Sequence, residues 1–210
     1  MRRYILMLIT ILPIFSLAET SKFVEGIHYS KIKKPILYTD KNSITVSEVF
    51  WYGCKGCYLS APKVKEWQST LSAGIDLEHL PAILRDSQRV HAELYYMIES
   101  LGLGDLAHHV VFKEIHENGN KLKTERQLEE FFKGFGVSHS DFVSTYKSKE
   151  VLLKVQRTDF RIRRMQIAST PAFVVDGRYI VSSTLDGGYT KIFEVINYLV
   201  EKVRSDRLEP

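Results

Sequence analysis

The chain has 210 residues, enough for one domain with an insertion or for two small domains. Its hydrophobic content of 44% supports a packed core, and its formal net charge is only +4. Arg2 and Arg3 belong to the leader segment described next, and without them the charge is +2. A basic surplus this small, spread along the chain, argues against nucleic acid as a ligand.

The first 18 residues have the layout of a secretory signal peptide. Two arginines precede an uncharged, mostly apolar run at 4–17, and the small residues Ser16 and Ala18 predict a cut after Ala18. A membrane-spanning helix needs about 20 apolar residues, so a permanent anchor is the less favoured alternative. We therefore expect a mature protein that is soluble and lies outside the cytoplasm.

The only two cysteines are separated by two residues, in the order Cys54-Lys55-Gly56-Cys57. A bridge across two residues closes almost no loop, so it stabilises a fold only weakly. A structural zinc site needs four ligands, and no second cysteine pair or nearby Cys/His pair completes one. We interpret the pair as a disulfide that is made and broken during turnover, with a structural bridge as the alternative.

The segment around the cysteines predicts a strand followed by a helix. Residues 44–52 (ITVSEVFWY) are mostly β-branched or aromatic, which is typical of a buried strand. Gly53 allows a sharp turn, and apolar residues then recur at helical spacing. Cys54 is thus expected at a helix N-terminus, where free N–H groups favour the reactive thiolate. Cys57, one turn further on, is expected to be the more buried, resolving thiol.

A β-hairpin is predicted far downstream. Two short apolar runs, 172–175 and 178–181, flank Asp176-Gly177, a dipeptide that favours a type I′ turn. Pro171 stands where the first strand begins, a place where a sheet tolerates proline. Because only about 5–6% of X–Pro bonds in folded proteins are cis, this local pattern by itself favours a trans bond.

The long stretch between Cys57 and Thr170 is predicted to begin with a returning strand at 75–83 and to continue as helices. Three apolar stripes predict the first helices: Val90, Leu94, Met97, Ile98 and Leu101; Leu106, Val110 and Ile115; and Leu128, Phe131, Phe132 and Phe135, the last behind a Thr124/Gln127 capping box. Ser138, with Asp141, is predicted to start one long helix that runs from 142 towards 165, and 191–203 forms the last helix.

A Cys-x-x-Cys motif after a buried strand, with Thr-Pro opening a later hairpin, resembles the thioredoxin fold. The likeness to the DsbA-like periplasmic thiol:disulfide oxidoreductases is closer. It includes Glu48 six residues before the first cysteine, Phe50-Trp51-Tyr52 before the motif, Tyr58 after it, and the block 160–179. The resemblance covers essentially the whole mature chain.

This resemblance implies an α/β thioredoxin fold, a central mixed β-sheet flanked by helices, with an inserted all-helical subdomain. The expected organisation is a signal peptide (1–18), a first part of the core with the Cys-x-x-Cys motif (19–83), a helical insertion (84–165), and a second part of the core with the cis-proline hairpin and the last helix (166–210).

The resemblance also implies site residues. Pro171 is expected to be cis and to face the Cys54–Cys57 disulfide, with the neighbouring Thr170 backbone pairing with bound substrate. A buried carboxylate in an apolar strand costs several kcal/mol unless it has a partner, so the presence of Glu48 indicates a function. The resemblance implies that this function is that of a buried proton acceptor beneath the active site. A surface salt bridge is the alternative for Glu48.

The implied activity is the introduction of disulfide bonds into exported proteins in the periplasm. The expected partners are unfolded or reduced exported proteins and a DsbB-like, quinone-linked membrane protein that re-oxidises the enzyme. We expect a monomer without cofactor or metal. Lys55 and Gly56, which replace the family's usual Pro-His, are expected to tune the redox potential.

Two other functions stay open. Thr170 stands where DsbA oxidases commonly have valine, and threonine there is typical of disulfide isomerases and reductases. Dedicated isomerases carry an N-terminal dimerisation region, for which 19–43 is short. A redox-inactive binding module or chaperone is the third possibility.

Two further groups of polar residues, three histidines and four arginines, are expected to have structural rather than catalytic roles. We expect His108, His109 and His116 to be solvated surface rather than metal ligands, since no acid or cysteine obviously completes a site. A basic cluster near a helix end is expected to interact with the helix dipole, with docking of an acidic partner as the alternative: Arg157, Arg161, Arg163 and Arg164.

Overall fold

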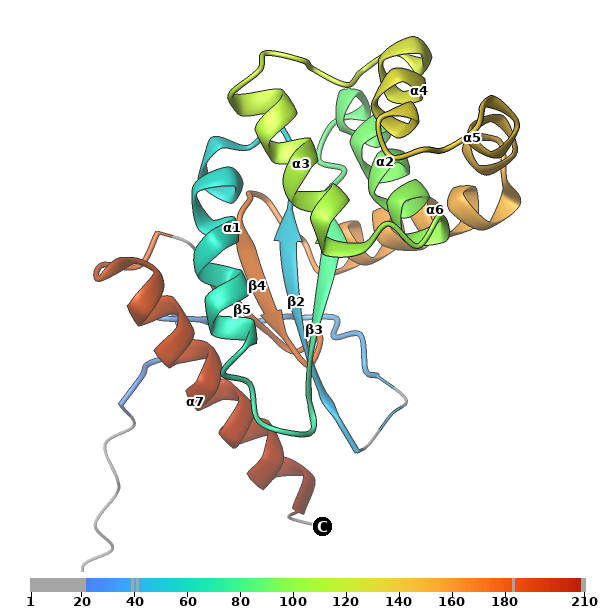
Figure 1. The fold of residues 1–210 in the computed structure, drawn as a ribbon. Coiled ribbons are helices and arrows are strands. Elements are labelled where there is room, and N and C mark those ends of the chain that lie inside the picture. Colours follow the sequence, from blue (N-terminus) through green and yellow to red (C-terminus); the bar gives the residue numbers. More distant parts are fainter. Residues whose placement is uncertain (1–21, 39, 41, 183, 209–210) are drawn as a thin grey trace, which may run out of the picture.

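The computed structural model describes residues 22–38, 40, 42–182 and 184–208, so the predicted signal peptide lies outside the described residues. A five-stranded mixed sheet forms the centre, in the order β1-β5-β4-β2-β3 (Figure 1). Only the β2–β3 pair is parallel, and the other neighbours are antiparallel. The strands are β1 (Ser30–Lys31), β2 (Ile44–Phe50), β3 (Ile75–Pro81), β4 (Ala172–Val175) and β5 (Tyr179–Ser182).

The central strand β2 is buried on both faces, as its apolar sequence predicts. Side chains alternate along a strand, so Val46, Glu48 and Phe50 point to one face and Ser47 and Val49 to the other. Helices α1 (Lys55–Gln68) and α7 (Gly188–Leu208) cover the first face and share one core with it. The end of α6 (Lys149–Arg164) packs against the second face.

A helical subdomain, α2–α6, separates β3 from β4 in the chain and lies at one end of the sheet (Figure 1). After the short 3₁₀ helix η1 (Asp86–Gln88), its members are α2 (Arg89–Ser100), α3 (Gly104–His116), α4 (Glu125–Lys133), α5 (His139–Tyr146) and α6. Its core is continuous with the active-site helix, because Cys57 and Ala61 belong to the same apolar cluster. Among the described residues, no helix has the length and apolar character needed to cross a membrane.

Two helix predictions were wrong in their extent. The expected long helix towards residue 165 is divided into α5 and α6, because Ser148 takes an extended conformation and its side chain caps the N-terminus of α6 by accepting from the N–H of Val151. The last helix is longer than predicted and spans Gly188–Leu208.

The predicted caps and turn are confirmed, but one apolar stripe was wrong. Thr124 and Gln127 form the capping box of α4. Asp176 and Gly177 both have positive φ, at 52° and 62°, as a type I′ turn requires. Leu106, however, is 70% exposed. The buried stripe of α3 consists instead of Ala107, His108, Val111, Phe112 and Ile115.

The prediction that Arg161 serves the helix dipole was also wrong. Its guanidinium binds both carboxylate oxygens of Glu78, at 2.5 and 2.7 Å, and the pair joins α6 to β3. Ser47 and Tyr38 also donate hydrogen bonds to Glu78. Burial alone raises the pKa of Glu78, but the hydrogen bonds and charge of Arg161 outweigh it, so the pKa lies below its usual 4.5.

We expect Arg161→Leu to lower the free energy of unfolding by about 3 kcal/mol at pH 7, because it leaves a half-buried carboxylate without its cation. Since the folded-state pKa of Glu78 is lowered, the ion pair stabilises the fold above pH 4.5 and its contribution is lost as pH falls through the folded value. The free energies of unfolding in urea of wild type and variant should therefore converge as pH falls through the lowered pKa of Glu78. The matched control is Arg163→Leu, on the same helix but with an exposed side chain. Equal losses in the two variants would contradict this account.

Candidate active site

The two cysteines lie where β2 gives way to α1. Cys54 is the N-cap of α1 with extended backbone angles (φ −83°, ψ 116°), and its sulfur accepts a hydrogen bond from the Cys57 N–H at 3.2 Å. Both thiols are free; Cys54 is partly exposed and Cys57 is fully buried. The predicted positions of the two cysteines are confirmed.

The glycine before the motif is required by a close approach of side chain and backbone. Gly53 has no positive φ, but a Cβ there would lie 2.3 Å from the Trp51 ring. The indole therefore packs against the bare backbone between β2 and Cys54. Its Nε1–H donates to His91 Nδ1 at 2.9 Å, which holds the ring in place.

A second loop, far away in sequence, completes the site. The Thr170–Pro171 bond is cis, as the resemblance implied, and the carbonyl oxygen of Thr170 lies 3.4 Å from the Cys54 sulfur. On the other side, a Cβ at Gly56 would lie 3.1 Å from Pro171 Cδ. The Cys-x-x-Cys segment and the proline loop are therefore in direct contact, and Gly56 leaves the least possible bulk between them.

Hydrogen bonds and burial shift the pKa values of the two thiols in opposite directions. The Cys57 thiol, hydrogen-bonded to the Cys54 sulfur, is the largest influence that lowers the pKa of Cys54 to about 6. Burial opposes this shift, whereas the Thr170 side chain and the backbone N–H groups of Cys57 and Gly56 reinforce it. Burial also raises the pKa of Cys57 far above its usual value, and its hydrogen bond to Cys54 adds to this. At neutral pH, Cys54 is therefore the thiolate and Cys57 the thiol.

Lys55 lies next to this thiolate in sequence, but its ammonium is placed over a ring. Its Nζ lies 4.5 Å from the centroid of the Tyr58 ring, a cation–π contact on the exposed side of the motif. Tyr58 in turn donates to Glu117 and stacks on His116 with ring centroids 4.8 Å apart. The Lys55 side chain thus belongs to the surface that joins α1 to α3.

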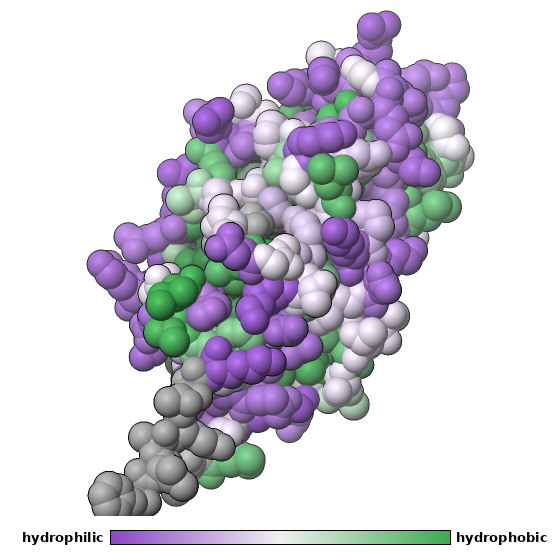
Figure 2. Space-filling model, turned by 90° about the vertical axis from the view of Figure 1, so that its left-hand side faces the viewer, coloured by the Kyte–Doolittle hydropathy of each residue, from purple (hydrophilic) through white to green (hydrophobic). Residues whose placement is uncertain are grey.

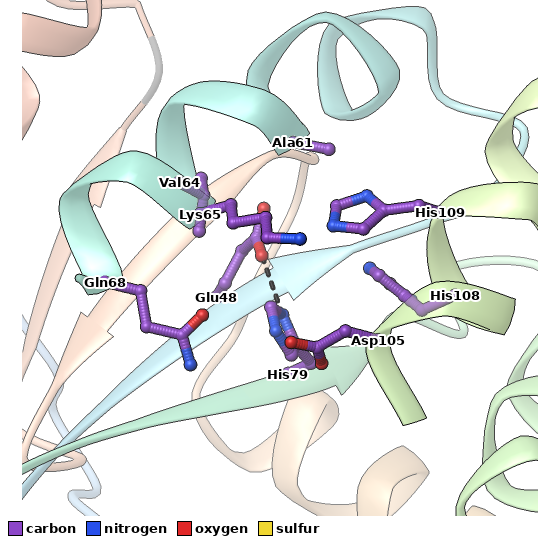
Figure 3. Close-up of a pocket in the computed structure, with 9 residues that line it drawn as sticks. All are labelled: Glu48, Ala61, Val64, Lys65, Gln68, His79, Asp105, His108 and His109. Atoms are coloured by element: carbon purple, nitrogen blue, oxygen red, sulfur yellow. Dashed lines mark hydrogen bonds and ion pairs between the residues drawn. The ribbon is translucent and has the colours of Figure 1, made fainter. Parts of the chain in front are cut away.

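Glu48 is only 3% exposed, so the alternative of a surface salt bridge is wrong. It lies on the sheet face covered by α1, and its carboxylate is 2.8 Å from His79 Nδ1, the residue opposite it in the β2–β3 register (Figure 3). Sequence analysis had not included His79. The available signal was its place in β3, two residues before Pro81 and on the same face as Glu48.

The prediction of solvated histidines was wrong for His108, which is 6% exposed. Its Nδ1 lies 2.8 Å from the Tyr52 hydroxyl, and burial lowers the pKa of His108 well below the usual 6.5, so this ring is neutral. His116 donates from Nε2 to the Tyr52 carbonyl at 2.8 Å. The signal that was missed is helical phase, because His108 is in register with Val111 and Phe112. In the part of the chain that the structure describes, no group of three His, Cys, Asp or Glu side chains is placed to hold a metal ion.

We expect the Cys54 thiolate to titrate with a midpoint near pH 6, because the hydrogen bonds that it accepts favour the charged form. The thiolate absorbance at about 240 nm measures this in the reduced protein. Thr170→Val removes one of these hydrogen bonds and should raise the midpoint. The control Thr70→Val, at the far end of α1, should leave it unchanged. A midpoint that is the same in all three proteins would show that Thr170 does not act on the thiolate.

Comparisons with known proteins agree with this geometry. Residues 42–188 match the family described as "DSBA-like thioredoxin domain". The chain is 30% identical over 188 residues to the thiol:disulfide interchange protein DsbA of Pseudomonas aeruginosa, covering 90% of this chain and 89% of that protein. The DsbA of Bordetella parapertussis is 30% identical over 177 residues, with 84% of each chain covered.

Solved structures extend the likeness to the whole architecture. The crystal structure of Pseudomonas aeruginosa DsbA superposes with a TM-score of 0.84 at 29% identity, covering 90% of this chain and 99% of that one. The oxidoreductase DsbA from Xylella fastidiosa gives a TM-score of 0.80 at 26% identity, covering 87% and 98%. The chain therefore belongs to the DSBA-like thioredoxin domain family and is a protein thiol:disulfide oxidoreductase.

Proposed function

We propose that this oxidoreductase introduces disulfide bonds into reduced proteins exported to the periplasm, with Cys54 as the nucleophile and Cys57 as the resolving thiol. The observation that carries the proposal is the contrast between the two sulfurs: one partly exposed and stabilised as a thiolate at a helix N-terminus, the other buried and protonated. A stabilised Cys54 thiolate is a good leaving group and favours the reduced enzyme, which makes the oxidised enzyme a donor of disulfides.

The reaction proceeds by two exchanges. A substrate thiolate attacks the Cys54 sulfur of the enzyme disulfide, the Cys54–Cys57 bond breaks, and Cys57 takes up a proton. A second substrate thiolate then attacks the substrate sulfur of the mixed disulfide. Cys54 leaves as a thiolate, and the substrate departs with the new disulfide.

The neighbouring residues have supporting roles in this proposal. The backbone of Thr170, beside the cis Pro171, pairs with the extended substrate while its cysteine lies against Cys54. Pro171 keeps that backbone in contact with the Cys-x-x-Cys segment. Glu48 is the buried acceptor of the proton that Cys57 exchanges. Lys55 and Gly56 set how strongly the thiolate is stabilised.

We also propose the partners and location that the resemblance implied. The enzyme is exported by a signal peptide cut after Ala18, and a DsbB-like, quinone-linked membrane protein re-oxidises it. It acts as a monomer. In support of this, the hydrophobic side chains on the face shown in Figure 2 form separate patches within a largely hydrophilic surface. Exposed apolar side chains are likewise scattered over several helices, among them Leu59 on α1, Leu106 on α3 and Phe160 on α6.

The division of labour between the cysteines can be tested by trapping. Cys54→Ser should abolish disulfide transfer to a reduced substrate, because no accessible nucleophile remains. Cys57→Ser should accumulate covalent complexes through Cys54, because its thiolate still attacks a substrate disulfide and no buried thiol remains to release the substrate by attacking the Cys54 sulfur. Non-reducing electrophoresis and mass mapping of the trapped sulfur measure both. Complexes trapped on Cys57 in the Cys54→Ser variant would reverse the assignment.

A reductase or isomerase of the same fold is the second candidate, and Thr170 favours it. The redox-inactive module is disfavoured, because both thiols are free and one lies at a helix N-terminus. Reduction potential separates the first two candidates, since it follows the stabilisation of the reduced form.

We expect a potential between the values of about −120 mV known for a strongly oxidising DsbA and about −270 mV for thioredoxin, measured by equilibration with glutathione. Exchanging Lys55-Gly56 for Pro-His should raise the potential and lower the Cys54 pKa, because a histidine cation beside the sulfur stabilises the thiolate. A wild-type potential at or below that of thioredoxin would favour the reductase.

A further inference from the structure

His91 is a buried histidine of α2 whose two ring nitrogens both meet partners that are distant in the sequence. Only 2% of the residue is exposed. Its Nδ1 lies 2.9 Å from the Trp51 indole nitrogen, and its Nε2 lies 3.0 Å from the Lys121 carbonyl oxygen. An indole N–H can only donate and a carbonyl oxygen can only accept, so Nδ1 is the acceptor and Nε2 carries the hydrogen. Both contacts therefore need the neutral ring in this one tautomer.

The loop between α3 and α4 is fixed where it meets His91. Leu122, the residue after the accepting carbonyl, is fully buried and belongs to the core of the helical subdomain. The side chain of Asn120, just before that carbonyl, donates to Glu114 on α3 at 3.2 Å. His91 thus connects Trp51, at the end of β2, with the core of the helical subdomain.

Trp51 contacts the redox centre at three points. Its indole packs against the backbone of Gly53, where a Cβ would lie 2.3 Å from the ring. Its carbonyl oxygen accepts from the Cys54 N–H at 2.9 Å. Its backbone also hydrogen-bonds the Cys57 sulfur in a way that favours the charged form, although burial outweighs this and keeps the pKa of Cys57 high. Since Cys57 leaves as a thiolate in the first exchange, the position of Trp51 affects both sulfurs.

Protonation of His91 is incompatible with this arrangement, because a protonated ring carries hydrogens on both nitrogens and Nδ1–H would face the indole N–H. Burial lowers the pKa of His91 below the usual 6.5, and the charge of Lys123 adds to this, whereas the backbone of Lys121 and Leu122 opposes it only in part. Tyr52, whose ring packs edge-on against His91, is neutral because burial raises its pKa well above 10. Within the described ranges, no carboxylate pairs with His91. The indole hydrogen bond is therefore intact at neutral pH and is lost in acid.

We propose that His91 is a positioning residue for disulfide exchange: by accepting the indole hydrogen bond it holds Trp51 against Gly53 and keeps both sulfurs in their reactive geometry, and its protonation releases the indole and slows exchange. This inference rests on the proposed function and names a residue that lies outside the Cys-x-x-Cys and proline motifs. His91 exchanges its own proton with solvent as the pH changes, and it transfers no proton to or from either sulfur.

The test measures the rate of disulfide transfer from the oxidised enzyme to a dithiol peptide between pH 4 and 8, for wild type, His91→Asn and His91→Leu. Asparagine keeps an acceptor near the place of Nδ1 but cannot be protonated there, whereas leucine has no acceptor at any pH. At pH 8, His91→Asn should match wild type and His91→Leu should be about fivefold slower, which is the effect of losing one ordinary hydrogen bond. As the pH falls through the lowered pKa of His91, the ratio of His91→Asn to wild type should rise from one to about fivefold. This ratio cancels the ionisation of the peptide thiols.

Two controls isolate the hydrogen bond. The Nδ1 of His28 likewise accepts an N–H, from Val24 at 3.0 Å, but this histidine packs on Phe23 in the core beside α7. His28→Asn should therefore react like wild type at every pH. Trp51→Phe keeps a ring against Gly53 but has no N–H to lose, so its rate relative to His91→Asn should not change with pH.

NMR of the indole N–H groups in the wild-type protein keeps the proposal testable if the His91 variants do not fold. The chain has two tryptophans, and the indole of Trp67 donates to Asn197, an amide that does not titrate. The Trp51 indole signal should shift with a midpoint below pH 6.5, and the Trp67 signal should stay in place.

Two results overturn the inference while disulfide transfer itself stands: a Trp51 signal that moves no more than that of Trp67, or a ratio of His91→Asn to wild type that stays near one down to pH 4. Failure of the wild type to oxidise the peptide at any pH overturns the proposed function. The indole titration then still decides whether His91 holds Trp51.

Discussion

The hydrogen bond from the Cys57 N–H to the Cys54 sulfur is the interaction on which the rest of the site depends. It exists because Cys54 is the N-cap of α1, so that its side chain takes the place of the oxygen that normally satisfies the first free N–H groups of a helix. A sulfur in this position is stabilised when it is charged. The same geometry places Cys57 one turn inside the helix, where burial keeps its proton on. This capping bond, the hydrogen bond from the Cys57 thiol and the burial of Cys57 together give the two thiols opposite character.

Because side chains alternate along β2, its two polar residues lie on opposite faces of the sheet. Successive residues Ser47 and Glu48 face opposite sides of the sheet, and each meets a polar residue at the same level of β3. On the α6 face, Ser47 and Glu78 join Arg161 in a structural ion pair that attaches the helical subdomain to the sheet. On the α1 face, Glu48 meets His79. The two acids therefore have different surroundings: Glu78 has a permanent cation in Arg161, whereas Glu48 has a histidine partner.

The helical subdomain is held against the sheet by hydrogen bonds at the end of β2. His91 accepts from the Trp51 indole, and His108 and His116 bond the hydroxyl and carbonyl of Tyr52. These contacts order the two residues that precede Gly53 and Cys54. The position of the N-cap is consequently set by α2 and α3 as well as by the sheet, which explains why Cys57 belongs to the core of the subdomain rather than to that of the sheet.

The sequence by itself determined most of the local secondary structure around the site, because those elements depend on interactions between residues that are close in the chain. Periodicity and residues with strong backbone preferences correctly predicted the helix that begins at Cys54, the Asp176-Gly177 turn and the Thr124 capping box. They also predicted the strand that starts at 44, although it ends at 50 rather than at 52. The cis bond before Pro171 was implied by family resemblance alone, because the local pattern favours trans.

Tertiary structure decided what depends on partners distant in sequence. Arg161 and Glu78, and likewise Tyr52 and His108, meet only because the sheet and the helices bring them together. No local pattern distinguishes Arg161 from its neighbours on α6. Helical phase indicates that His108 is buried, but it cannot identify Tyr52 as its partner. The low pKa of Cys54 also depends on Thr170. The antiparallel pairing of β4 with β2 places Thr170 at the end of β2, beside Cys54. Sequence alone thus determined where the reactive sulfurs lie along the chain, and the fold decided their acidity, because hydrogen bonds and burial act through space.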